Sequence, residues 1–145
     1  MSELQGAVLV AQLDRIDDII GRLRAAKQFL CDKLARVRGI ELARVPDPAG
    51  DTGAGLVFFV ADAERAVRTV AALEAEGIRA MRNYGGKTLY GQPAIVNAGL
   101  GQPGQCPKSE ALVARTIFLG LTTTFSRRDL GDIVTAVRKV ARALG

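Results

Sequence analysis

The densest group of side chains that could do chemistry lies in residues 82–90, Arg-Asn-Tyr-Gly-Gly-Lys-Thr-Leu-Tyr. Two cations, an amide and two phenols stand beside glycines, which let a backbone approach a ligand closely. Such a set suits an anionic or polyhydroxylated ligand. It also fits a surface loop whose tyrosines pack at its base, and the residues favour neither interpretation. The candidate substrate-binding residues are Arg82, Asn83, Tyr84, Lys87 and Tyr90.

Two motifs in the same region predict no catalysis. A Schiff-base lysine needs desolvation, and the glycines beside Lys87 make a desolvated position unexpected. Residues 99–104, Gly-Leu-Gly-Gln-Pro-Gly, match G-x-G-x-x-G. That fingerprint binds dinucleotides where it follows a strand and opens a helix, whereas here it contains Pro103 and lies within a loop. We therefore assign no catalytic residue to this chain.

Metal and redox chemistry are also not expected. The chain has no histidine, the commonest metal ligand. Cys31 and Cys106 are too few for a cysteine-rich metal site and too far apart for a C-x-x-C motif. We predict a buried helical cysteine and a loop cysteine, and no metal site.

Composition indicates one globular domain over residues 1–145. Hydrophobic residues make up 48% and charged residues 24% of the chain. No apolar run reaches the roughly 18 residues that span a bilayer, and no basic head precedes the first apolar segment. We expect a cytoplasmic protein that does not enter a membrane.

The net charge of +5 raises the question of nucleic acid. Basic residues alternate with acidic ones, and aromatic residues, which would stack on bases, are only 5%. We therefore expect no nucleic-acid partner. The cations of the first helix are interpreted as a solvated face: Arg22, Arg24, Lys27, Lys33, Arg36 and Arg38.

A single long helix is predicted for residues 1–38. Ser2 and Gln5 form a capping box at its start, and an apolar stripe continues to Val37, before Arg38-Gly39. Some 35 residues at about 1.5 Å each give roughly 52 Å, against a radius of gyration of about 14–15 Å for a compact chain of this length. The first turns should therefore overhang. The predicted partner surface consists of Leu4, Val8 and Ala11.

The rest of the chain, residues 39–145, alternates short strands with helices. Strands are predicted at 40–45, 55–60, 78–83 and 116–121, and helices at 63–76, at 107–115 and after a capping pair formed by Ser126 and Asp129. Residues 84–106 are predicted as a long irregular loop. Two successive strands before a helix argue against a doubly wound sheet. We predict an α+β fold, with a long N-terminal helix, then a small mixed or antiparallel sheet with helices packed on one face.

The opening resembles the interdomain helix of the DegT/StrS family of pyridoxal-phosphate-dependent sugar aminotransferases. The resemblance rests on Met-Ser-Glu-Leu-Gln at residues 1–5, Ala-Gln-Leu-Asp-Arg-Ile-Asp-Asp-Ile-Ile at 11–20 and Arg-Leu-Arg at 22–24. The later segments 55–60, 72–78, 106–121 and 125–130 are similar, in order, to the family's C-terminal small domain.

The resemblance covers only the C-terminal third of a family enzyme. It implies a large domain outside this chain, which carries the lysine bonded to pyridoxal phosphate, so this chain alone would bind no cofactor and would not transaminate. It implies a keto-sugar substrate and a homo-oligomer. Where many members have His-Tyr, this chain has Asn83-Tyr84, which leaves the sugar specificity open and admits other keto-sugars or cyclitols as substrates.

Two kinds of protein remain consistent with these residues. One is a domain of a complete aminotransferase, present as an excised domain, a late-start product or half of a split enzyme. The other is a free-standing interaction or dimerisation module that keeps the fold without catalysis.

Overall fold

The computed structural model describes residues 2–144. The helices are α1 (Glu3–Leu13), α2 (Ile16–Leu34), α3 (Ala63–Ala75), α4 (Pro93–Asn97), α5 (Pro107–Ala114) and α6 (Arg127–Leu144). The strands are β1 (Glu41–Leu42), β2 (Gly55–Phe59), β3 (Ala80–Arg82) and β4 (Thr116–Gly120), and two 3-10 turns are η1 (Asn83–Gly86) and η2 (Leu89–Gly91).

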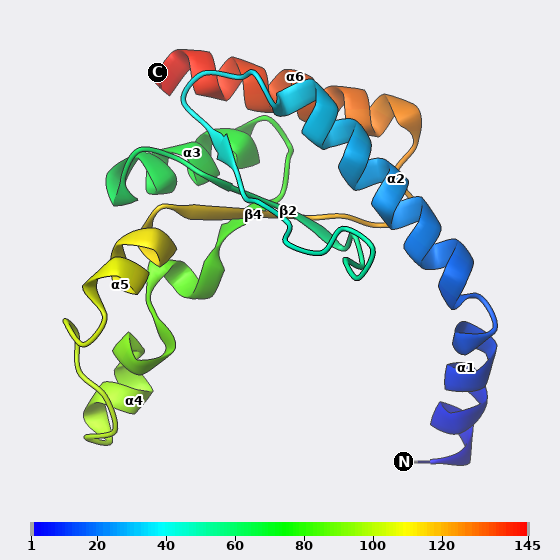
Figure 1. Ribbon diagram of the computed structural model, residues 1–145, viewed down its shortest axis with the longest axis horizontal. Coiled ribbons are helices and arrows are strands. Elements are labelled where there is room, and N and C mark those ends of the chain that lie inside the picture. Colours follow the sequence, from blue (N-terminus) through cyan, green and yellow to red (C-terminus); the bar gives the residue numbers. More distant parts are fainter. Residues whose placement is uncertain (1, 145) are drawn as a thin grey trace.

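The strands form one antiparallel sheet in the order β1-β2-β4-β3. Alternation along β2 and β4 buries one face, where Leu56, Phe58 and Ile117 are almost fully enclosed. Helices α2, α3 and α6 cover this face, as Figure 1 shows. The prediction of an α+β fold with an antiparallel sheet and helices on one face is confirmed.

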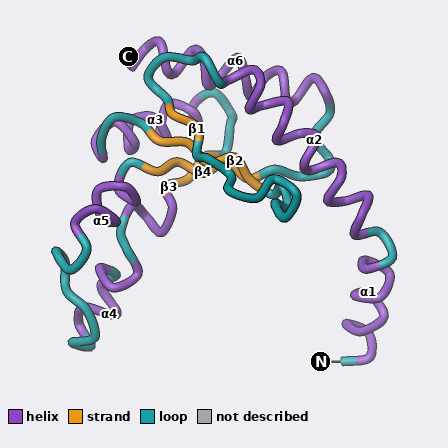
Figure 2. The backbone as a smooth tube through the Cα atoms, in the orientation of Figure 1, coloured by secondary structure: helices purple, strands orange, loops and turns teal. Residues whose placement is uncertain are grey.

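The second face of the sheet is less covered. Val57, Phe59 and Phe118 are half-buried there, and Met81 is 44% exposed. Helices α4 and α5 lie to one side of the sheet and α1 to the other, so that the backbone has the outline of an arch (Figure 2).

Capping residues fix the ends of the helices where the sequence predicted them. Ser2 Oγ accepts the N–H of Gln5, and the Ser2 N–H donates to Gln5 Oε1. Asp62 Oδ1 accepts the Arg65 N–H at 2.7 Å at the start of α3. The Ser126–Asp129 pair closes reciprocally ahead of α6, whose apolar stripe is buried.

The prediction of one continuous N-terminal helix is wrong at residues 14–15. Arg15 has φ −109° and ψ 2°, and its N–H donates to the carbonyl of Gln12, three residues back. Asp14 is a weak helix former, and α1 has no buried residue that would hold the two helices in line. The N-terminal segment therefore forms two helices, α1 and α2, with lengths of roughly 16 Å and 28 Å.

The prediction of an irregular loop at 84–106 is also wrong in part. Most of η1, all of η2 and all of α4 lie within it. Pro93 occupies the first turn of α4, a position where its missing N–H costs nothing.

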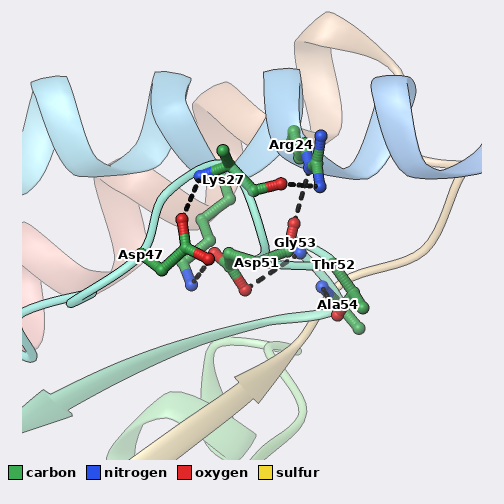
Figure 3. Close-up of polar contacts among 8 residues, drawn as sticks. Arg24, Lys27, Asp47, Asp51, Thr52, Gly53 and Ala54 are labelled. Atoms are coloured by element: carbon green, nitrogen blue, oxygen red, sulfur yellow. Dashed lines mark hydrogen bonds and ion pairs between the residues drawn. The ribbon is translucent and has the colours of Figure 1, made fainter.

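The cations of α2 do not form a purely solvated face. Arg24 donates to the carbonyls of Ala49 and Asp51, and Lys27 Nζ lies 2.5 Å from Asp51 Oδ2 (Figure 3). Gly53, at φ +73°, lies so close to α2 that a Cβ there would meet the backbone of Arg24 at 2.6 Å. These contacts fasten loop 46–54 to α2, ahead of β2.

Candidate functional site

Residues 82–90 leave the sheet at the end of β3 and wind through η1 and η2 beside α5 (Figures 1 and 2). The segment thus lies at the edge of the sheet, where η1 packs against α5 and η2 packs against α4. The five predicted binding residues fall on one short stretch of chain, but their side chains divide into two groups.

Arg82 belongs to the inward group. Its Nη2 donates to the carbonyl of Ala114 at the end of α5, 3.1 Å away. Gly86 lies directly over the guanidinium, because a Cβ added at Gly86 would come within 1.9 Å of Arg82 Nη2. Arg82 therefore ties η1 to α5, and only part of its guanidinium is accessible to a ligand.

Tyr90 is the second inward residue. Its hydroxyl donates to Glu110 Oε1 at 2.9 Å and accepts the N–H of Cys106 at 3.1 Å. The same Glu110 oxygen accepts the N–H of Gly104 at 2.7 Å. Burial, with the neighbouring Glu110 carboxylate, raises the pKa of the Tyr90 phenol. The phenol therefore stays protonated and anchors the chain that leads into α5.

Asn83, Tyr84 and Lys87 form the outward group, with exposed side chains. Tyr84 is 67% exposed and has φ +49°, which is uncommon for a residue with a bulky side chain. Its carbonyl accepts the Nε2–H of Gln92 at 2.9 Å, which helps to hold this backbone. Strain of this kind is typical of positions where a side chain must be presented in one direction.

The sequence did not predict the supporting residues Gln92 and Glu110. Glu110 lies 20 positions from Tyr90, and Gln92 lies eight positions from Tyr84 and five from Lys87, so no recognised local motif connects them. Only the turns of η1, η2 and α5 bring these side chains together.

The predicted partner surface lies on α1. Leu4 is 75% and Val8 54% exposed, and Ala11 is exposed as well. Leu4 and Val8 line a shallow groove of about 520 Å³ with Gln5 and Leu9. Such a continuous apolar surface is typical of an interface.

Residues 2–144 do not form a complete site for a cofactor that is covalently bonded to a lysine. None of the lysines there is buried, and Lys27, which is half-buried, is paired with Asp51. Lys87 projects outward. These residues do not fit pyridoxal phosphate on their own, since no lysine lies in an enclosed pocket where a covalent bond to it would be protected from water. Within the same described part of the chain, no three metal-binding side chains gather at one point.

Between residues 2 and 144, no helix combines the length and the apolar character that crossing a membrane requires.

Three solved structures resemble this chain closely in fold. DesV from S. venezuelae is 25% identical, with a TM-score of 0.85 over 97% of this chain and 37% of DesV. Spr1654 from Streptococcus pneumoniae, described as a sugar aminotransferase and solved in its PLP form, is 19% identical, with a TM-score of 0.86 over all of this chain and 37% of its own. An aminotransferase from Psychrobacter cryohalolentis is 18% identical, with a TM-score of 0.85 over 99% of this chain and 40% of its own.

The chain thus spans between 37% and 40% of the length of these three proteins. The model of the DegT/DnrJ/EryC1/StrS aminotransferase family matches residues 1–138, which is nearly the whole sequence. This chain therefore belongs to the DegT/DnrJ/EryC1/StrS aminotransferase family.

Proposed function

We propose that this chain is the C-terminal small domain of a pyridoxal-phosphate-dependent aminotransferase that transfers an amino group to a keto-sugar or cyclitol. Residues 1–38 would be the connection to the large domain, and residues 39–145 the small domain itself. The family match, together with coverage of only about 35–40% of the solved relatives, supports this assignment.

The observation that carries the proposal is the uncovered apolar surface of α1. Burying a side chain such as Leu4 or Val8 contributes roughly 1.5–3 kcal/mol each. A family domain that leaves this contribution unused is incomplete, and the large domain is the partner that would cover it. The complete enzyme would be a homo-oligomer, as the family resemblance implies.

The outward side chains would contact substrate. Asn83 and Tyr84 offer an amide and a phenol to sugar hydroxyls, and Lys87 offers a cation to an anionic substituent. Arg82 and Tyr90 would contribute at the base of the segment, where they also hold its backbone. The cofactor would be bound by residues outside this chain, which by itself would not transfer amino groups.

A trapping experiment tests the absence of a cofactor lysine here. The full chain is mixed with stoichiometric pyridoxal phosphate, reduced with borohydride and mapped by mass spectrometry. We expect no stoichiometric adduct, and equal trace labelling in Lys87→Arg and Lys108→Arg variants. A stoichiometric adduct on Lys87 would contradict the proposal.

A second arm tests the missing partner. A polypeptide that carries the large domain with its lysine should co-purify with this chain and give amino transfer to a keto-sugar. Full transaminase activity of this chain without any partner would argue against an incomplete enzyme.

A further inference from the structure

Six positively charged side chains line one cleft of about 580 Å³. Its lining residues come from the C-terminal ends of α2 and α6, the turn after α2 and the first turn of α3. Figure 1 shows these helices on the same side of the sheet. The other lining residues of the cleft are apolar or glycine, and none is acidic. The cations are Lys33, Arg36, Arg38, Arg65, Arg138 and Arg142.

The helix ends do not account for this much charge. The C-terminus of a helix carries the equivalent of about half a negative charge, so the ends of α2 and α6 together offset roughly one cation of the six. Among residues 2–144, none of the six lies within ion-pair distance of a carboxylate. Most of the positive charge in the cleft is therefore uncompensated.

Arg65 is the residue least explained by the fold. It stands in the first turn of α3, where the helix dipole disfavours a cation. Its Nη2 is buried and has no hydrogen-bond partner among the described residues. Buried donors in native proteins are almost always paired, so we infer that a ligand bound in the cleft supplies the hydrogen-bond acceptor for this atom.

Two other cations are held in place in advance. Arg138 Nη2 donates to the carbonyl of Lys33 at 2.7 Å, and Lys33 Nζ lies 5.9 Å from the centre of the Phe29 ring. Groups fixed before binding lose less conformational entropy when a ligand arrives. Five of the six cations are arginines, whose forked donors match phosphate oxygens.

We propose that this cleft binds a small anion with two adjacent phosphate groups, such as inorganic pyrophosphate or the diphosphate of a larger metabolite. The volume lies within the range of small-molecule sites, about 300–1,000 Å³. The inference rests on the residues of the cleft and does not depend on the proposed function.

The surroundings of the cleft favour a small anion over a nucleic-acid strand. No aromatic side chain lines it, so bases would find nothing on which to stack. Farther along the exposed side of α6, Lys139 lies 2.7 Å from Glu76, which neutralises the next cation. Lys139, the cation next to Arg138 on α6, therefore adds no uncompensated charge beside the cleft.

Isothermal titration calorimetry of the full chain with inorganic pyrophosphate, at physiological salt, measures the affinity and tests the proposal. We expect saturable one-site binding, with adenosine diphosphate bound within about threefold of pyrophosphate because nothing in the lining recognises a base. Arg65→Met keeps an apolar stem of similar length and should weaken binding about tenfold or more, as the loss of one charge-assisted hydrogen bond predicts. Arg68→Met is the matched control, since exposed Arg68 lies on the same helix outside the lining. It should change affinity less than twofold.

A second variant keeps the proposal testable if Arg65→Met does not fold. Arg36→Gln with Arg142→Gln alters only exposed side chains of the cleft and should also weaken binding at least tenfold. The proposal is overturned if pyrophosphate does not bind at millimolar concentration, if sulfate binds equally well, or if all variants bind like the original chain. It is also overturned if duplex DNA binds more tightly than pyrophosphate and is not displaced by it.

Discussion

Tyr84 and Tyr90 show how two residues of one type, six positions apart, come to different roles. The hydroxyl of Tyr90 is engaged by Glu110 and Cys106, whereas the Tyr84 side chain projects outward from a left-handed backbone. The sequence placed both phenols in one candidate site. It could not separate them, because the partner that distinguishes Tyr90 is a carboxylate 20 residues away.

Removal of the Tyr90 hydroxyl tests this distinction. Tyr90→Phe leaves the Glu110 carboxylate without its phenol donor and frees the N–H of Cys106, so the amides of residues 104–106 should lose protection from hydrogen exchange and the thermal midpoint should fall. Tyr84→Phe removes an exposed hydroxyl and should leave both measurements unchanged. Equal effects of the two variants would show that Tyr90 is not an anchor.

Secondary-structure elements were predictable wherever a local signal marked their ends. The Ser126–Asp129 pair caps α6 as predicted, and Asp62 caps α3 at the predicted start of that helix, because capping depends on neighbouring residues only. The helix break at Arg15 could not be predicted, because residues 13–16 contain no proline or glycine. The binding of loop 46–54 by Arg24 depends on tertiary contact, which spacing along the chain does not encode.

The fastening of loop 46–54 makes stability depend on pH. The ammonium of Lys27, followed by the N–H of Gly53, lowers the pKa of Asp51 below its ordinary value of 3.8. A carboxyl with a lowered folded-state pKa stabilises fully above its unfolded value and loses that contribution as the pH falls through the folded one. The ion pair should therefore weaken below about pH 4.

Urea unfolding measured across the acid range checks this expectation. Asp51→Asn should lower the free energy of unfolding at neutral pH and give a shallower decline in acid than the original chain. Asp17→Asn makes the same charge change on an exposed side of α2, without the contacts to Lys27 and Gly53. A decline in Asp51→Asn as steep as in the original chain would contradict this role for the ion pair.

At the scale of the molecule, the arch leaves α1 without a buried residue while α2, α3 and α6 enclose the core. The exposure of α1 agrees with the predicted overhang, although the single helix that this prediction assumed is broken at Arg15. The basic cleft could not be predicted, since its cations come from α2, the turn that follows α2, α3 and α6. Lys33, Arg36 and Arg38 were interpreted as part of a solvated face. Helix packing, rather than any motif, brings Arg65 to Arg138.

The uncovered α1 predicts self-association of the chain when no partner is present. Leu4→Glu combined with Val8→Glu places charges in the apolar groove and should shift the molar mass from light scattering toward that of a monomer. Gln12→Glu adds a charge to an exposed polar position of α1 and should not. An unchanged mass in the double variant would locate the contact elsewhere.

The break at Asp14–Arg15 is a point at which α2 could rotate relative to α1. No buried side chain of α1 opposes bending there, and the backbone carries the connection through the bond from Arg15 to Gln12. If α1 is clamped by a partner, a tilt of about 10° at this point would swing the far end of α2 by roughly 5 Å over its length of about 28 Å. The sheet and residues 82–90 would travel with it, so a small rotation at one joint would move the whole domain toward or away from whatever holds the first helix.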